Sequence, residues 1–177
     1  MRVISGKYKG KVLSGFDILG TRPTMDRVKE SMFGCIQGFI CDSVCLDLFA
    51  GSGSLGIEAL SNGASACYFV EKHNEIYNIL EKNLKGIENS FLIKKDYMDA
   101  LNMFVREGIK FDIIFLDPPY KFNLINDILN FIYAHDLLND GGIILCEFEN
   151  EIVCSDKFKL IKDRKYGSKK VFIYEKL

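Results

Sequence analysis

Hydrophobic positions along the chain form short runs that alternate with longer amphipathic segments. The run Phe111–Leu116 is rich in β-branched and aromatic residues. Such runs are typical of strands buried on both faces of a parallel sheet. Between them, apolar residues recur with the spacing of a helix. The pattern therefore predicts an α/β fold with a doubly wound, mostly parallel sheet.

The expected strands lie at 44–49, 65–70, 91–93, 111–116 and 143–148, and the expected helices at 55–61, 75–85, 97–105 and 124–134. Two alternating segments at 157–164 and 169–176 have no helix between them, which predicts an antiparallel C-terminal hairpin.

Residues 1–16 also alternate, around three glycines, and predict an N-terminal β-hairpin. A helix should follow from Met25 to about Gln37, with Thr24 as its N-cap. We expect one domain over residues 1–177, with a hairpin and helix extension at 1–40 and a Rossmann-like core at 43–177.

Composition excludes several classes of protein. No apolar run is long enough for a membrane span, and residues 1–11 lack the apolar stretch of a signal peptide, so we expect a cytoplasmic location. The six cysteines form no C-x-x-C pair, and both histidines are distant from any cysteine pair, so we expect no metal site.

Charge is distributed unevenly, although the net charge is −1. Residues 1–30 hold seven Lys or Arg and three Asp or Glu, and residues 157–177 hold eight and two. Two basic ends therefore flank an acidic middle. If the ends meet in space, they form a surface of the kind that binds phosphates; otherwise they are solvated edge segments.

A glycine-rich turn, Gly51-x-Gly53-x-x-Gly56, follows an expected strand and opens a helix. Glu71 ends the next strand, twenty residues after Gly51, where it suits the hydroxyls of a ribose. This pattern predicts an adenosine-type cofactor, either NAD or S-adenosylmethionine. A carboxylate at Asp47 favours a cationic amino-acid tail over a pyrophosphate, which it would repel.

The most specific stretch ends the fourth core strand, with Asp117-Pro118-Pro119-Tyr120. Prolines cannot donate to a sheet ladder, so the strand stops and leaves Asp117 at its carboxyl end. Ligands bind at that edge of open α/β sheets. A hydrogen-bond acceptor beside an aromatic ring suits a planar nitrogenous substrate.

These motifs together resemble S-adenosylmethionine-dependent amino-methyltransferases. Residues 2–13, residues 21–30 and Lys165-Tyr166-Gly167 narrow the resemblance to the RsmD-type family, which methylates N2 of a guanine in bacterial 16S ribosomal RNA. Lys9 stands where the family usually has Arg, and Phe148 where it tends to have His.

The resemblance implies a class I methyltransferase fold with a seven-stranded sheet, acting as a monomer on 16S ribosomal RNA or an assembly intermediate of the small subunit. The implied catalytic and base-binding residues are Asp117, Pro118 and Tyr120. The implied cofactor-binding residues are Arg22, Thr24, Asp47, Phe49, Gly51, Gly53, Glu71, Lys72, Asp96 and Tyr97. The implied RNA contacts are Lys7, Lys9, Lys11 and Arg27.

Three alternatives stay open at this point. The same acid-Pro-Pro-aromatic stretch serves an adenine-N6 methyltransferase on RNA or DNA, although the usual DNA-reading domain is absent. A non-catalytic RNA-binding ribosome assembly factor could retain the fold, but Asp117 and Glu71 argue against it. An NAD-dependent oxidoreductase uses a similar glycine turn, but no hydride-handling residues stand out.

Overall fold

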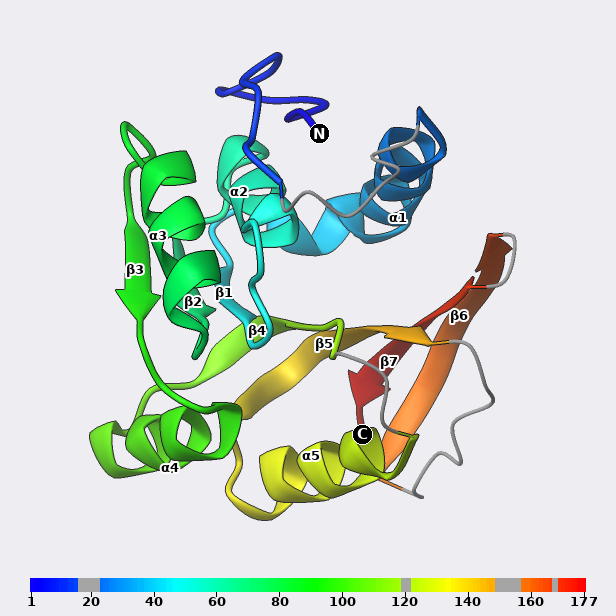
Figure 1. Ribbon diagram of the computed structural model, residues 1–177. Helices are drawn as coiled ribbons and strands as arrows, with labels where there is room; N and C mark the ends of the chain where they lie inside the picture. The colour runs from blue at the N-terminus through cyan, green and yellow to red at the C-terminus, as the bar shows by residue number, and fades with distance from the viewer. Residues whose placement is uncertain (16–22, 119–121, 149–156, 167–168) are drawn as a thin grey trace.

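A seven-stranded sheet forms the centre of the molecule in the computed structural model (Figure 1). The structure describes residues 1–15, 23–118, 122–148, 157–166 and 169–177. The strand order across the sheet is β3-β2-β1-β4-β5-β7-β6. The strands are β1 (Val44–Asp47), β2 (Ala66–Val70), β3 (Ser90–Ile93), β4 (Phe111–Leu116), β5 (Leu138–Phe148), β6 (Phe158–Tyr166) and β7 (Lys169–Lys176).

Strands β1 to β5 pair in parallel, so their carboxyl ends meet at one edge of the sheet. Strand β7 lies antiparallel between β5 and β6. The predicted mostly parallel sheet with an antiparallel C-terminal hairpin is therefore confirmed.

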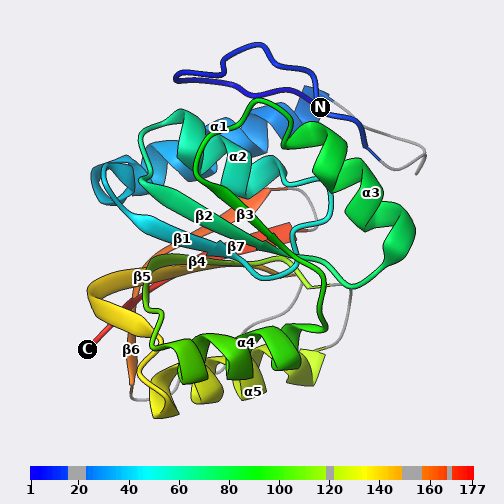
Figure 2. The same ribbon diagram turned by 90° about the vertical axis from the view of Figure 1, so that its left-hand side faces the viewer.

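The helices form one layer on each face of this sheet (Figure 2). One layer contains α1 (Pro23–Ile40), α2 (Ser54–Ser61) and α3 (Asn74–Asn83), and the other contains α4 (Tyr97–Glu107) and α5 (Phe122–Ala134).

Each layer covers a separate hydrophobic core. Along β4, Ile113 and Phe115 contribute to the core on the α1–α3 side, whereas Ile114 and Leu116 contribute to the core on the α4–α5 side. Because both faces of the strand are covered, nearly every residue of the run is apolar.

Most predicted boundaries are within two or three residues of the structure, and the starts of α1 and β5 differ for identifiable reasons. Helix α1 begins at Pro23, so Thr24 lies inside its first turn instead of capping it. Proline suits the first helical position because its missing N–H has no partner there in any case. Strand β5 begins at Leu138, five residues earlier than expected, because Phe111 pairs with Leu138 before an irregularity in the ladder.

The N-terminal segment, residues 1–15, does not form the predicted β-hairpin. Its antiparallel pairing is limited to one isolated bridge between Arg2 and Val12 and the backbone hydrogen bonds around it, from Leu13 to Met1, from Val3 to Lys11 and from Gly10 to Val3. The backbone N–H groups of Ile4 and Ser5 donate instead to the carboxylate of Glu58 on α2, both at 2.9 Å. A paired strand cannot continue where its N–H groups are bonded to a helix side chain.

The N-terminal segment crosses the outer side of α2 and is packed firmly onto it (Figure 2). Val3 and Leu13 are buried in the core on the α1–α3 side. Gly6 has a φ of +79°, and a Cβ there would lie only 1.8 Å from the Ser61 carbonyl oxygen. Lys7 N–H donates to that same carbonyl at 2.7 Å. The segment is therefore an integral part of the fold.

None of the described helices has the length and apolar character to cross a bilayer.

Candidate active site

Three carboxylates gather at the carboxyl ends of three adjacent strands. Asp47 is the last residue of β1, Glu71 directly follows β2, and Asp117 directly follows β4. Strand β1 lies between β2 and β4, and Asp47 is in register with Phe69 and Phe115 on those strands. The sheet therefore brings these three predicted residues to one edge.

Asp47 is the most deeply buried of the three, at 2% exposure. Its Oδ2 accepts a hydrogen bond from the Gly56 N–H at 3.1 Å. Burial, with a smaller contribution from the negative charges of Asp117 and Glu71, raises the pKa of Asp47 to about 7, against the lowering effect of that hydrogen bond. A cation placed here would reverse this penalty, so the site favours a positively charged ligand.

The glycine-rich turn lies beside Asp47. Gly51 and Gly53 both have positive φ angles, of 55° and 80°, which disfavour residues with a Cβ. The Gly53 N–H closes the turn on the Ala50 carbonyl at 2.7 Å. Gly56 serves packing, because a Cβ there would lie 2.3 Å from the Phe69 ring of β2. The turn thus places α2 directly against the sheet.

Glu71 is 8% exposed, and its Oε1 accepts from the His73 N–H at 2.8 Å. This bond fixes the carboxylate at the end of β2. The neighbouring Lys72 forms an ion pair with Asp96 at 3.2 Å, so the structure joins the chain after β2 to the start of α4.

Asp96 also caps α4, with Oδ1 accepting from the Met98 N–H at 3.2 Å. The next residue, Tyr97, packs its ring against Phe49 with 5.5 Å between centroids. Four of the predicted cofactor residues, Phe49, Lys72, Asp96 and Tyr97, therefore form two contacting pairs around the ends of β1 to β3.

At the end of β4, Asp117 is exposed and Pro118 is buried. Tyr120 and Arg22 lie outside the described residues, and Thr24 is described only by its backbone in α1. These three remain predictions from the sequence.

The predicted RNA-binding lysines lie at the opposite edge of the sheet. Lys7 forms an ion pair with Glu88 at 2.7 Å, and Lys11 Nζ donates to the Lys85 carbonyl at 2.7 Å. Residues 85–88 precede the amino end of β3. The structure therefore does not bring Lys7 and Lys11 close to Asp117. Lys9 is exposed on the same segment.

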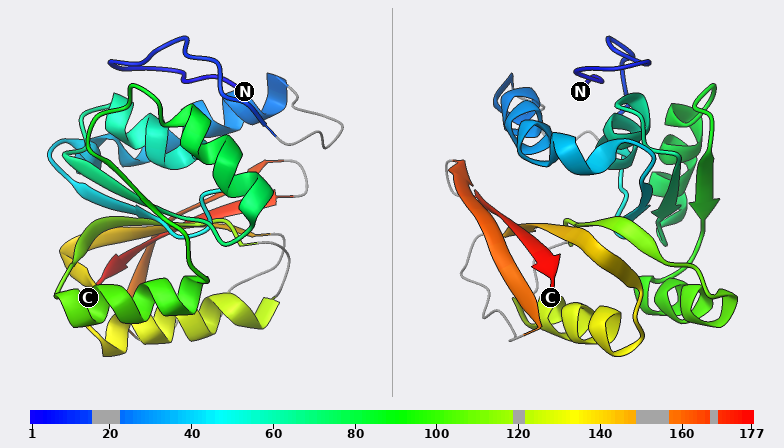
Figure 3. Two further views of the ribbon diagram at one scale, coloured as in Figure 1. Left: turned by 60° about the vertical axis from the view of Figure 1, so that its left-hand side comes forward. Right: turned by 180° about the vertical axis from the view of Figure 1, so that it is seen from behind.

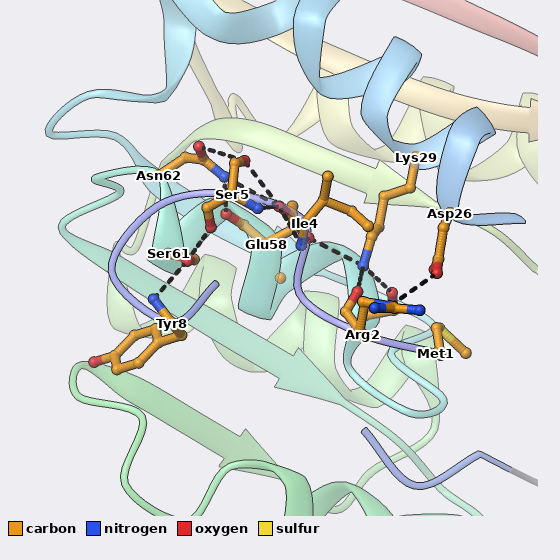
Figure 4. Close-up of polar contacts among 12 residues, drawn as sticks. Met1, Arg2, Ile4, Ser5, Tyr8, Asp26, Lys29, Glu58, Ser61 and Asn62 are labelled. Atoms are coloured by element: carbon orange, nitrogen blue, oxygen red, sulfur yellow. Dashed lines mark hydrogen bonds and ion pairs between the residues drawn. The ribbon is translucent and has the colours of Figure 1, made fainter. Parts of the chain in front are cut away.

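Sequence reasoning missed a buried ion pair that anchors the N-terminal segment. Lys29 of α1 lies 3.0 Å from Glu58 of α2, with side-chain exposures of 6% and 1% (Figure 4). Lys29 Nζ also donates to the Arg2 carbonyl at 2.7 Å and to Ser54 Oγ at 3.1 Å. In the sequence, Lys29 and Glu58 each look like an ordinary exposed charge on an amphipathic helix. The pair could have been predicted only by noticing that both charges fall on the apolar faces of two helices that pack together.

Asn83, at the end of α3, was also missed. It is 4% exposed and exchanges two 2.9 Å hydrogen bonds with the backbone of Ser14. Its Nδ2 also donates to the Ser52 carbonyl in the glycine-rich turn at 2.9 Å. Asn83 thus links the N-terminal segment to the turn.

The strand order, the glycine-rich turn after β1 and the acid after β2 define a Rossmann-like methyltransferase fold. The chain belongs to the family described as Conserved hypothetical protein 95, which matches residues 1–175, and this confirms the resemblance to the RsmD-type family.

Relatives with high coverage support this assignment. The chain is 39% identical to "Putative rRNA methyltransferase YlbH" of Bacillus subtilis (strain 168), over 99% of both chains. It is 34% identical to "Ribosomal RNA small subunit methyltransferase D" of Haemophilus influenzae, over 99% of this chain and 93% of the relative. The solved structure "Putative methyltransferase yhhF from Escherichia coli" matches with a TM-score of 0.87 at 31% identity, over 99% of this chain and 97% of that one.

Proposed function

We propose that this protein transfers a methyl group from S-adenosylmethionine to an exocyclic base amine of small-subunit ribosomal RNA, specifically N2 of a guanine. The observation that carries the proposal is the convergence of Asp47, Glu71 and Asp117 at one sheet edge beside the glycine-rich turn. The names of the related proteins support ribosomal RNA as the substrate class.

The residues at this edge fit S-adenosylmethionine by their chemistry. This cofactor carries a positive sulfonium, a positive ammonium and a ribose diol, and it supplies an activated methyl group when bound. Asp47 would pair with the ammonium group, which offsets the cost of its own burial. Glu71 would accept from the ribose hydroxyls, and Asp96 from the adenine amino group. A pyrophosphate, as in NAD, would be repelled by Asp47.

Asp117 is the candidate catalytic residue. The lone pair of a guanine amino group is delocalised into the ring, and this weakens it as a nucleophile. Hydrogen bonds from the amine to the Asp117 carboxylate would localise the lone pair and direct it in line toward the methyl group. The carboxylate would also accept the proton that the amine loses. Tyr120 would stack on the base, which must be unpaired or flipped out to reach the site.

Two experiments test the proposal. Calorimetry should show binding of S-adenosylmethionine and no binding of NAD; the opposite preference would end the methyltransferase assignment. Asp117→Ala should abolish methylation of a 16S ribosomal RNA transcript while leaving cofactor affinity near the wild-type value. The matched control is Asp127→Ala, which removes an exposed carboxylate on α5.

The modified nucleotide should then be identified by mass spectrometry of digested RNA. N2-methylguanosine is the expected product. N6-methyladenosine would retain the catalytic role of Asp117 but replace the proposed base.

A further inference from the structure

The paired end of β6 and β7 around Lys165 and Lys170, the hairpin tip, lies at the same edge of the sheet as Asp117. Leu116 at the end of β4 pairs with Cys146 of β5, and Cys146 pairs in turn with Phe172 of β7. Two residues further toward the tip, Lys170 of β7 lies opposite Lys165 of β6. Since Asp117 directly follows Leu116, these two lysines lie on its side of the sheet.

The distance from β4 to β6 is short enough for one RNA strand to cover. The order β4-β5-β7-β6 separates them by three strand spacings. Neighbouring strands are about 4.8 Å apart, so β6 lies about 14 Å from β4. A base placed at Asp117 would therefore leave its flanking phosphates within reach of the hairpin tip.

Among the described residues, the charges at this tip have no acidic partner. Like charges directly opposite each other on paired strands are destabilising, and Lys165 and Lys170 occupy such a position. In the part of the chain that the structure describes, neither lysine forms an ion pair, in contrast to Lys7 with Glu88. A polyanion bound across the tip would relieve the repulsion.

Helix α1 brings a further basic residue to this edge from the other face of the sheet, because Tyr166 packs on the α1–α3 side and its neighbour Lys165 points to the opposite face. Ser31 Oγ and Tyr166 Oη form a hydrogen bond of 2.7 Å, which holds the end of β6 against α1. Arg27 is exposed one turn earlier on the same face of the helix as Ser31. Figures 1 and 3 show the hairpin tip beside α1 from opposite sides.

We propose that Arg27, Lys165 and Lys170 form a basic rim that binds the RNA phosphates flanking the target base. This inference rests on the proposed function, because it assumes that the base amine reaches Asp117. The rim holds the strand at the active-site edge, whereas Lys7 and Lys11 lie at the opposite edge.

The test neutralises two charges at the tip with Lys165→Gln/Lys170→Gln. The matched control is Lys159→Gln/Lys162→Gln, which removes two charges from the same strand, one near its other end and one at its middle. Affinity for a 16S ribosomal RNA transcript is measured across a salt series. The slope of log K against log salt is negative, and each lost contact to a single strand reduces its magnitude by about 0.7. The slope of the tip variant should therefore be smaller in magnitude by about 1.4, and the variant should bind RNA roughly tenfold more weakly near 0.15 M salt.

Three further readouts separate this proposal from the proposed function. The tip variant should bind S-adenosylmethionine as tightly as the wild type, and its kcat at saturating RNA should be unchanged while KM rises. An unchanged slope and KM in the tip variant, or an equal loss in the control, would overturn the rim and leave the methyltransferase assignment standing. A wild-type protein that binds RNA through the rim but transfers no methyl group would contradict the proposed function alone.

Discussion

The buried ion pair between Lys29 and Glu58 gives the sharpest prediction about stability. Glu58→Ala removes a carboxylate that accepts from Lys29, from the N–H groups of Ile4 and Ser5, and from Ser5 Oγ. Within the described part of the chain, Lys29 would keep only its bonds to the Arg2 carbonyl and a serine hydroxyl. The substitution therefore leaves a buried ammonium group without a counter-ion and releases the N-terminal segment.

The expected cost follows from the burial of both partners. Removing one member of a buried ion pair typically costs about 3–5 kcal/mol, because the remaining charge is uncompensated. The unpaired N–H groups of Ile4 and Ser5 add to this, although the terms are not additive. We expect the free energy of unfolding to fall by about 3–5 kcal/mol, a large part of the roughly 5–15 kcal/mol of an ordinary domain.

Urea unfolding followed by circular dichroism measures this loss, and trypsin cleavage after Lys7, Lys9 and Lys11 reports release of the N-terminal segment. Glu58→Gln, which keeps an acceptor but no charge, should lose less. Adding Lys29→Met to Glu58→Ala should restore part of the stability, because no unpaired charge remains. A cost below about 1 kcal/mol for Glu58→Ala, or a double variant no more stable than Glu58→Ala alone, would show that the ion pair does not stabilise the fold in this way.

Three other predictions concern the site and the N-terminal segment. The pKa of Asp47 is about 7 in the folded state, whereas an aspartate in an unfolded chain has a pKa of about 4. The folded state therefore binds more protons between these values, and the free energy of unfolding falls as the pH rises from about 4 to 7. Asp47→Asn should therefore melt at a higher temperature than the wild type at pH 8 without cofactor. It should no longer bind S-adenosylmethionine, whose wild-type affinity should fall about tenfold per pH unit below 7. Gly6→Ala should cost more than 1 kcal/mol in urea unfolding, because a positive φ is combined with a clash against a backbone carbonyl. Asn83→Ala should weaken S-adenosylmethionine binding about tenfold by calorimetry, because the Ser52 carbonyl loses a buried donor worth about 1.4 kcal/mol.

Each of these three has a result that contradicts it. Equal melting of Asp47→Asn and wild type at pH 8 would show that the buried carboxylate is not destabilising. Gly10→Ala is the control for Gly6→Ala, since Gly10 has a similar φ of +86° with nothing within 4 Å of its added Cβ. Equal losses in the free energy of unfolding for Gly6→Ala and Gly10→Ala would show that the clash with the Ser61 carbonyl adds no cost. Unchanged cofactor affinity in Asn83→Ala would mean that the turn holds its shape without Asn83.

Local patterns determined the sheet and much of the candidate site. The bounds of β4 follow from its apolar run, because a strand covered on both faces needs apolar residues throughout. The glycine-rich turn and Glu71 were recognisable because their spacing reflects one βαβ unit, which is a local property of the chain. The antiparallel end of the sheet followed from two alternating segments with no helix between them.

Only the tertiary structure decided where the charged residues act. Lys29 and Glu58 lie on different helices, and nothing local indicates that they are paired away from water. Alternation in residues 1–16 predicts two strands, but Glu58 takes the backbone donors of Ile4 and Ser5 that a continued strand pairing would need. Both termini are basic, yet Lys7 lies far from Asp117 while Lys165 and Lys170 share its edge. Periodicity reports which residues face a core, whereas long-range packing sets which polar groups meet.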